Sequence, residues 1–208
     1  MSELGLFPLP IVLVPTERIP LHVFEPRYRE LIEECVEEGE PFGLVLSTGD
    51  GAVHEIGTRA LVSQVLEVLE DGRMNIVVEG GDRFRLLELT SGRAFATGLV
   101  EPVVDDDEPP EPDDEERALE VFRELAEAAE SDVDVPEPSS PQLDFELAAR
   151  VDFAVDSKQE LLATTSPRER MKKLIGYLET ALEAVRLEQT LRERAGQNGK
   201  VSPLDPEL

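Results

Sequence analysis

Few side chains in this sequence could carry out chemistry, and they are widely spaced. The nitrogen and sulfur groups able to bind a metal are His22, His54 and Cys35. A zinc site needs such ligands at short, regular intervals, and a metallopeptidase helix needs a His-Glu-x-x-His pattern. Neither spacing occurs, so the sequence predicts no metal site.

Cys35 is the one candidate thiol nucleophile. It lies among four glutamates at positions 33, 34, 37 and 38, and neighbouring negative charge raises the pKa of a thiol. It also falls on the apolar stripe of a predicted helix, where a free cysteine behaves as a small buried side chain. We therefore interpret Cys35 as a core residue. A single cysteine cannot form an intramolecular disulfide, which favours a reducing, cytoplasmic location.

The common catalytic patterns are missing as well. The sequence contains no G-x-x-x-x-G-K-[ST] phosphate-binding loop and no G-x-S-x-G nucleophile turn. It therefore predicts a protein without ATPase or peptidase activity, and without a cofactor.

Glu25, Arg27 and Tyr28 form a short polar group directly before and within a predicted helix. In a functional interpretation, they are contacts at the rim of a peptide-binding surface. In a structural interpretation, which we favour, Glu25 caps the first turn and Arg27 pairs with a carboxylate.

The charge balance excludes several classes of partner. The chain of 208 residues has 46 acidic and 20 basic residues and a net charge of −26. Nucleic acids and anionic membranes are bound through lysine and arginine, so neither is an expected partner. The N-terminus is acidic and interrupted by prolines, unlike a signal peptide, and no apolar run approaches the roughly 20 residues that span a bilayer. The sequence thus predicts a soluble cytoplasmic protein.

The elements that must position these residues are mainly β-strands over residues 1–103. One helix is predicted within them, starting near Pro26 and capped at its C-terminus by Gly39. Asp71-Gly72 indicates a hairpin, because both residues tolerate positive φ. Gly80-Gly81 is expected to break the returning strand as a turn or bulge with positive φ.

The second half of the chain begins with an acidic, proline-rich run. Residues 104–116 are predicted to be a linker, because their charges repel one another and they can bury little apolar surface. A helical subdomain is expected over residues 117–195, followed by a flexible tail over residues 196–208. Its last helix should run from Pro167 to about residue 194, and two S-x-x-E capping boxes are expected, at Ser157 and at Ser166.

Several blocks of this sequence resemble the N-terminal substrate-binding domain of the Lon protease. They are LFPLPIVLVP (6–15), IPLHVFEPRYREL (19–31), PFGLVL (41–46), residues 55–89 and residues 158–182. The resemblance implies an α+β fold, in which a β-rich, PUA-like pseudo-barrel is followed by a helical bundle with a long C-terminal helix. Nothing in the sequence resembles the Ser-Lys catalytic segment of that protease.

The resemblance also implies a function. It suggests a non-catalytic module that recognises polypeptide segments in protein quality control, with polypeptide substrates or a separate protease or ATPase as partners. The alternative is an enzyme or small-ligand-binding protein with a pocket in the β-domain, and the PUA-like relationship alone would suggest RNA binding, which the charge opposes.

The expected binding surface lies in residues 6–28. Prolines prevent this apolar segment from forming one long strand, so part of it should stay exposed beside charged residues, as in a protein contact site. The candidate contact residues are Leu9, Leu13, Leu21, Phe24, Glu25, Arg27 and Tyr28. The competing explanation is that the apolar members of this set are core.

Overall fold

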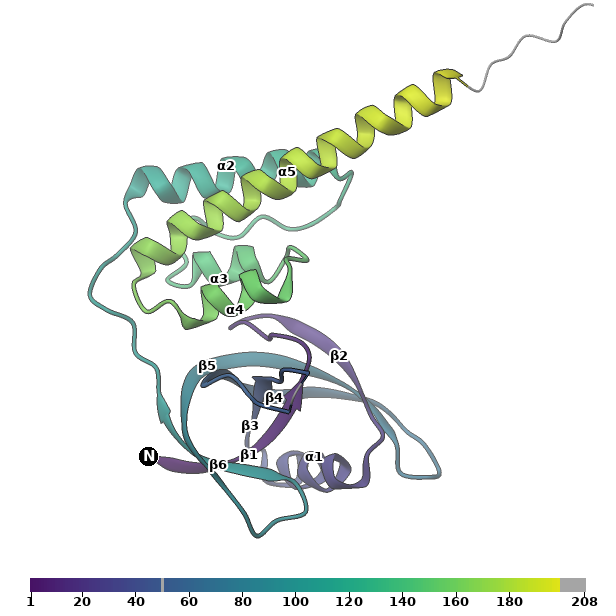
Figure 1. The fold of residues 1–208 in the computed structure, drawn as a ribbon, viewed down its shortest axis with the longest axis vertical. Coiled ribbons are helices and arrows are strands. Elements are labelled where there is room, and N and C mark those ends of the chain that lie inside the picture. Colours follow the sequence, from purple (N-terminus) through teal and green to yellow (C-terminus); the bar gives the residue numbers. More distant parts are fainter. Residues whose placement is uncertain (50, 199–208) are drawn as a thin grey trace, which may run out of the picture.

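The structure is a computed structural model, and it describes residues 1–49 and 51–198. A β-domain carries a layer of four helices at one end, and a further helix, α1, packs at the opposite end (Figure 1). The strands are β1 (Ser2–Leu9), β2 (Arg18–Val23), β3 (Phe42–Leu46), β4 (Ile56–Val68), β5 (Met74–Thr90) and β6 (Ala96–Pro102). The helices are α1 (Pro26–Glu38), α2 (Pro112–Ala128), α3 (Leu143–Ala148), α4 (Val155–Ala163) and α5 (Pro167–Asn198).

The strands form one curled sheet. Their order is β2-β5-β4-β3-β1-β6, and β5 also pairs with β6, so the sheet closes on itself through the long central strand β5. β1 and β3 are parallel, and the other pairs are antiparallel. The predicted α+β class is confirmed, with a barrel-like sheet followed by C-terminal helices.

Two local predictions in the β-domain are confirmed. Helix α1 begins at Pro26, and Gly39 ends it in the left-handed conformation with φ 70°, where the absence of a Cβ removes the steric cost. Gly72 has φ 81° and lies in the turn that joins β4 to β5. Short-range sequence therefore determines where this helix and this hairpin begin and end.

The prediction for Gly80-Gly81 is only partly right. The β4–β5 ladder is irregular between Thr58 and Ala60, opposite this pair, but β5 continues through both glycines and neither has positive φ. Gly80 is needed because the backbone at Val14 lies against it: a Cβ would overlap the Val14 carbonyl oxygen. Its N–H donates to Glu17 O over 2.9 Å, and its carbonyl accepts from Thr16 N over 2.8 Å.

The last part of the acidic run, residues 112–116, is helical, whereas we expected all of residues 104–116 to be a linker. Helix α2 already begins at Pro112, with Asp113, Asp114 and Glu115 in its first turn. Proline suits the first helical position, and carboxylates there interact favourably with the positive end of the helix dipole. The repulsion among these charges is thus offset by their position at a helix N-terminus.

The residues before α2 are tied to the start of α5. Ser166 caps α5 by accepting from Glu169 N over 3.2 Å, and its hydroxyl donates to Glu108 Oε2 over 2.7 Å. Arg168 N donates to Glu108 O over 3.1 Å. The predicted cap at Ser166 is therefore confirmed, whereas Ser157 lies inside α4, which begins at Val155.

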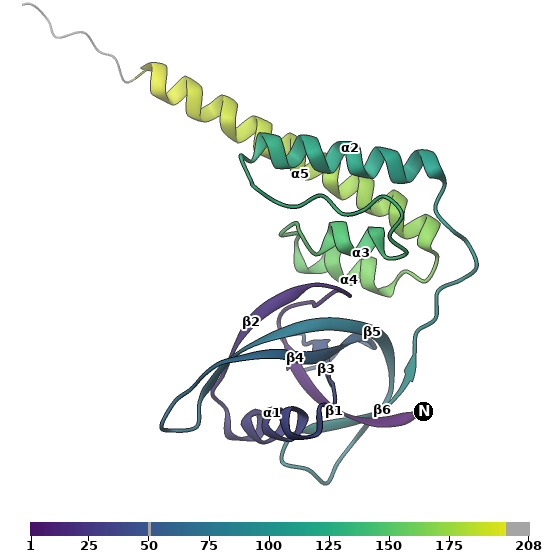
Figure 2. The ribbon, with the colours of Figure 1, turned by 180° about the vertical axis from the view of Figure 1, so that it is seen from behind.

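Helix α5 is longer than predicted. It extends to Asn198 and runs past the other helices (Figure 2). Residues 199–208 of the predicted tail lie outside the described residues. The buried side chains of α5 include Met171, Leu174, Leu178 and Leu182.

The helical layer and the β-domain share one apolar core. The cluster that includes Phe122, Leu147 and Leu174 also contains Val14 and Ile56 of the β-domain. A second cluster lies inside the β-domain between the sheet and α1. The division into a β-rich domain (residues 1–103) and a helical subdomain (residues 117–195) stays a prediction, but apolar side chains of the two parts pack in one cluster.

A buried ionic network crosses the same junction. Arg83 of β5 and Arg170 of α5 both pair with Asp105, and Arg170 Nε also donates to Asp144 Oδ2 over 2.6 Å. The ring of Phe145 lies 5.3 Å from the Arg83 guanidinium and 4.3 Å from that of Arg170. Asp105 is thus the acidic partner of Arg83 in this network.

The network shifts the ionisation of its members. Burial lowers the pKa of Arg83, although Asp105 acts against this. Burial alone would also lower the pKa of Arg170, but hydrogen bonds and charges from Asp105 and Asp144 outweigh it and raise that pKa. Burial would raise the pKa of Asp105, but bonds to Arg170 and Arg83 hold it below its ordinary value of 3.8.

A second buried pair supports the junction. Lys158 Nζ of α4 lies 2.5 Å from Glu17 Oε1, and Glu17 Oε2 accepts from Val14 N over 3.0 Å. Gln159 Nε2 donates to the carbonyl of Ile56 over 3.1 Å. The loop of residues 14–17, which packs against Gly80, therefore also contacts the helical layer.

We predict that Gly80→Ala destabilises the protein by about 1–3 kcal/mol, the usual cost of forcing an extra methyl group into a packed site. Gly81→Ala is the matched control, because a Cβ there would lie 3.3 Å from the nearest atom, Arg59 O. Urea unfolding measures both. An equal loss in the two variants would contradict the close-approach explanation.

We predict that Asp105→Asn lowers stability at about pH 7 and that this deficit shrinks in acid. The folded-state pKa of Asp105 lies below 3.8, so its stabilisation is fully present above that value and is lost as pH falls through the folded pKa. Urea unfolding from about pH 7 to pH 3 measures it. Asp107→Asn is the control, since Asp107 makes no ion pair in the described chain; a deficit independent of pH would contradict the assignment.

Candidate functional site

The apolar residues expected at the binding surface separate into two groups. Leu13 is fully buried in the cluster between the sheet and α1, so the expectation that it lies at the surface is wrong. Leu9 and Leu21 are half-buried against the same cluster. Phe24 is 59% exposed. Prolines interrupt the segment, as the sequence indicates, but the sheet still turns most of its apolar side chains inward.

The polar candidates mostly have structural roles. Tyr28 is buried, and its ring stacks on Phe7 at 4.1 Å between centroids; burial raises the pKa of Tyr28, and the charge of Arg27 acts against this. Arg27 pairs with Glu25 over 2.9 Å and lies 4.5 Å from the Tyr28 ring centroid. Glu25 occupies the N-cap position of α1, but its side chain makes no cap hydrogen bond, so that predicted role is wrong.

One group of exposed apolar residues lies on the hairpin ribbon, by which we mean β2 together with residues 61–79. The far half of β4 belongs to it, and the tip of the β4–β5 hairpin lies away from the helical layer (Figure 1). Its exposed apolar side chains in β4 are Leu61, Val65, Leu66 and Val68, and Phe24 follows β2 directly. Sequence reasoning placed a strand here but no site.

A surface hollow of about 540 Å³ crosses all three strands of the ribbon. Its lining residues are Pro20, Leu21, His22, Leu66, Glu67, Asn75 and Ile76. The hollow is thus lined mainly by apolar residues, and one carboxylate and one imidazole also line it.

The polar lining residues are joined to one another. His22 Nδ1 lies 2.7 Å from Asn75 Oδ1, and Asn75 Nδ2 donates to Glu67 Oε2 over 3.0 Å. The His22 ring also stacks near Phe24, with centroids 6.0 Å apart. This chain fixes the orientation of its side chains on the ribbon surface. It contains no hydroxyl or thiol, so it does not form a serine- or cysteine-type nucleophile site.

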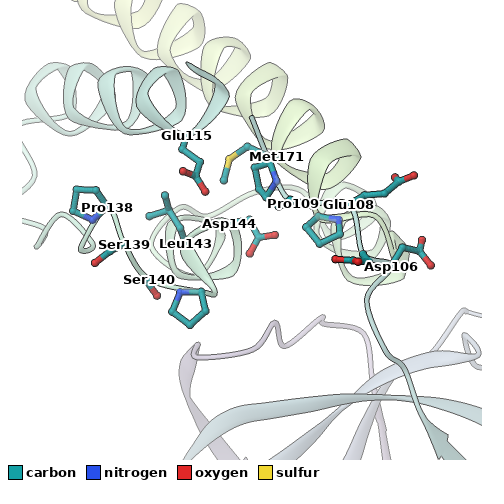
Figure 3. A pocket seen from close by; sticks show the side chains of 14 residues that line it. Asp106, Glu108, Pro109, Glu115, Pro138, Ser139, Ser140, Leu143, Asp144 and Met171 are labelled. Carbon is teal, nitrogen blue, oxygen red and sulfur yellow. The ribbon is translucent and has the colours of Figure 1, made fainter. Parts of the chain in front are cut away.

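A second cleft, of about 500 Å³, lies between the segment before α2, the loop before α3 and the start of α5 (Figure 3). Five carboxylates line it, and no lysine or arginine does. Three of the five already have partners: Asp106 accepts from Thr165, Glu108 accepts from Ser166, and Asp144 pairs with Arg170. We interpret this cleft as part of the packing that holds the helical layer.

Cys35 is buried, as predicted. Burial, with smaller contributions from Glu34, Glu38 and Glu40, raises the pKa of its thiol to about 11. A protonated, buried thiol is a poor nucleophile, so the core interpretation holds.

The described residues lack two further features. Within residues 1–49 and 51–198, no three or more His, Cys, Asp or Glu side chains are placed to hold a metal ion. In the same part of the chain, no helix combines the length and apolar character that crossing a membrane requires.

Comparison with known proteins gives a consistent result. Residues 3–180 match the family model described as the ATP-dependent protease La (Lon) substrate-binding domain. The Lon protease of Rhizobium meliloti is 27% identical over 205 residues, which are 88% of this chain and 25% of that protein. The Lon protease of Brucella suis is 28% identical over 213 residues, which are 88% and 24%. The chain thus spans about a quarter of the length of these relatives.

Solved structures show the same fold. The Lon N-terminal domain protein of Xanthomonas campestris superposes with a TM-score of 0.66 at 27% identity, covering 85% of this chain and 99% of that one. The N-terminal domain of Lon protease from the Mycobacterium avium complex gives a TM-score of 0.65 at 19% identity, covering 86% and 98%. The second similarity, at this identity, concerns the fold alone.

We predict a large loss of stability on truncating one candidate residue and almost none on truncating another. Leu13→Ala should lose about 2–5 kcal/mol, because it leaves a cavity in the core. Phe24→Ala should change stability by less than about 0.5 kcal/mol, because the side chain is mostly in solvent. Urea unfolding of both variants measures the difference, and a large loss for Phe24→Ala would place that ring in the core instead.

Proposed function

This chain belongs to the family of the ATP-dependent protease La (Lon) substrate-binding domain, and on that premise we propose that it is a non-catalytic module that captures unfolded polypeptide segments. Substrate binding is the role given in the description of the family. The observation that carries the proposal is the uncovered apolar surface of the hairpin ribbon. Exposed apolar surface rimmed by polar residues is typical of protein contact sites.

The shape of the surface favours a polypeptide over a small molecule. The hollow on the ribbon is open and spans three strands, whereas small-ligand sites are concave and bury most of the ligand. Phe24 and Leu66 supply the apolar contacts, and His22 and Glu67 supply polar groups at the rim. Of the residues expected from sequence, we retain Leu21 and Phe24 as direct contacts, with Glu25 and Arg27 beside them.

The negative charge of the chain favours polypeptides over nucleic acids and anionic membranes as partners. A net charge of −26 opposes nucleic acid and anionic membranes. As partners we propose unfolded polypeptides and a separate ATP-dependent protease or ATPase that processes them in protein quality control. A cytoplasmic location fits a chain whose single cysteine is buried and unpaired.

We predict that Leu66→Ser weakens the binding of an unfolded polypeptide by about tenfold. Burial of a leucine side chain contributes about 1.5–3 kcal/mol, and 1.4 kcal/mol corresponds to tenfold in affinity. The client is a reduced, carboxymethylated protein carrying a fluorescent label, and anisotropy measures the dissociation constant. The same mixtures, with ATP added, should show no client cleavage.

Leu89→Ser is the matched control for this measurement. Leu89 is 57% exposed and Leu66 is 52% exposed, and both lie in strands, but Leu89 lies outside the ribbon. Its substitution should leave affinity unchanged. Equal losses in the two variants would locate binding elsewhere, and absence of binding by the unmodified protein would refute the proposed function.

A further inference from the structure

The far half of β4 has a strand neighbour on one side only. Residues 61–68 pair with β5, but β3 pairs with β4 only at Thr58, Arg59 and Ala60. Within the described residues, no turn or loop makes a backbone hydrogen bond to residues 61–68. All of them except the half-buried Val62 are exposed. The outer edge of this segment therefore offers N–H and C=O groups with no protein partner.

This edge carries few of the features that usually prevent strand pairing. Proteins protect such edges with lysine, proline, bulges or a covering element. The segment LVSQVLEV contains neither lysine nor proline, whereas the edge strand β2 has Pro20 in its middle. Leu61, Val65, Leu66 and Val68 place exposed apolar side chains along the same edge.

Two irregularities in the ladder help to define what can bind there. The β4–β5 register shifts between Val62 and Gln64 and again between Val65 and Glu67. Bulges bend and twist a strand, so the edge does not match a second rigid sheet edge, such as that of another copy of this chain. A single extended segment can follow the bend, because its backbone is not yet fixed by other strands.

The charges of the ribbon point to the chemistry of that segment. Arg18 pairs with Glu79 over 2.7 Å, and Arg73 pairs with Asp71 over 2.8 Å. The remaining carboxylates of the ribbon, Glu67 and Glu70, have no basic partner in the described chain, although Glu67 accepts a hydrogen bond from Asn75. The edge is thus apolar with unneutralised negative charge beside it, which is complementary to apolar segments that carry lysine or arginine.

We propose that residues 61–68 of β4 bind an extended segment of the unfolded client as an added strand, and that segments combining apolar and basic residues are preferred. Main-chain hydrogen bonds to the strand edge would supply affinity for many sequences, and the alternate side chains would supply selectivity. This inference rests on the proposed function, because it specifies how the same ribbon holds its client.

The test uses a labelled ten-residue synthetic peptide in which lysine alternates with valine or leucine. We expect it to bind, and we expect hydrogen exchange of the amides in residues 61–68 to slow on binding. A peptide with glutamate in place of lysine should bind at least about tenfold more weakly. Protection confined to other parts of the chain, or equal affinity of the two peptides, would overturn the proposal.

Backbone methylation distinguishes an added strand from side-chain contacts alone. In an extended peptide, the N–H groups of alternate residues point to opposite sides. Methylating the N–H of every lysine, or instead of every apolar residue, should therefore weaken binding at least about tenfold in one peptide and leave it nearly unchanged in the other. Equal affinity of both methylated peptides refutes strand addition while leaving polypeptide binding intact. Failure of the unmethylated peptide and of the carboxymethylated client alike refutes the proposed function itself.

Discussion

The structure depends on the burial of two guanidinium groups at the junction between the sheet and the helices. Arg83 and Arg170 are almost inaccessible to solvent, and an unpaired buried charge costs several kcal/mol. Each therefore needs a complete set of acceptors, which comes from four places in the chain: Asp105, Asp144 and the carbonyls of Leu162 and Thr164. Because these acceptors come from separate segments, the two arginines tie those segments and the helical layer to β5.

This requirement accounts for one contact of the acidic run, and two helix N-termini account for others. Asp105 is needed by the arginines, Glu108 by the cap of α5, and the carboxylates after Pro112 by the N-terminus of α2. The same contacts commit one end of the β-domain to the helices. The tip of the β4–β5 hairpin, away from that junction, stays uncovered (Figure 1). The charged junction and the exposed apolar ribbon thus divide the β-domain into a structural end and an accessible surface.

Features that are determined by neighbouring residues could be predicted from the sequence, whereas features that depend on distant contacts could not. Pro26, Gly39 and Gly72 act through their own backbone geometry, so helix α1 and the β4–β5 hairpin were predictable. Family resemblance supplied the barrel-like sheet and the helices. The burial of Leu13 and Tyr28 depends on partners in distant strands. The role of Gly80 depends on Val14, which lies far away in sequence.

The exposed edge of β4 could not be predicted, because it arises from where β3 stops pairing. The one local signal was apolar residues at both odd and even positions over residues 61–68.

An exposed apolar edge is normally an aggregation hazard, and the net charge of the chain accounts for its tolerance here. Two copies of this chain each carry a net charge of −26. Their like charges oppose association edge to edge when salt screening is weak. Nearby bulges add a geometric obstacle to the same encounter. Neither obstacle applies to a flexible segment that carries positive charge. The features that keep the ribbon from pairing with itself are therefore the ones that would select its client: attraction at long range comes from charge, and affinity at short range comes from apolar side chains and the open strand edge.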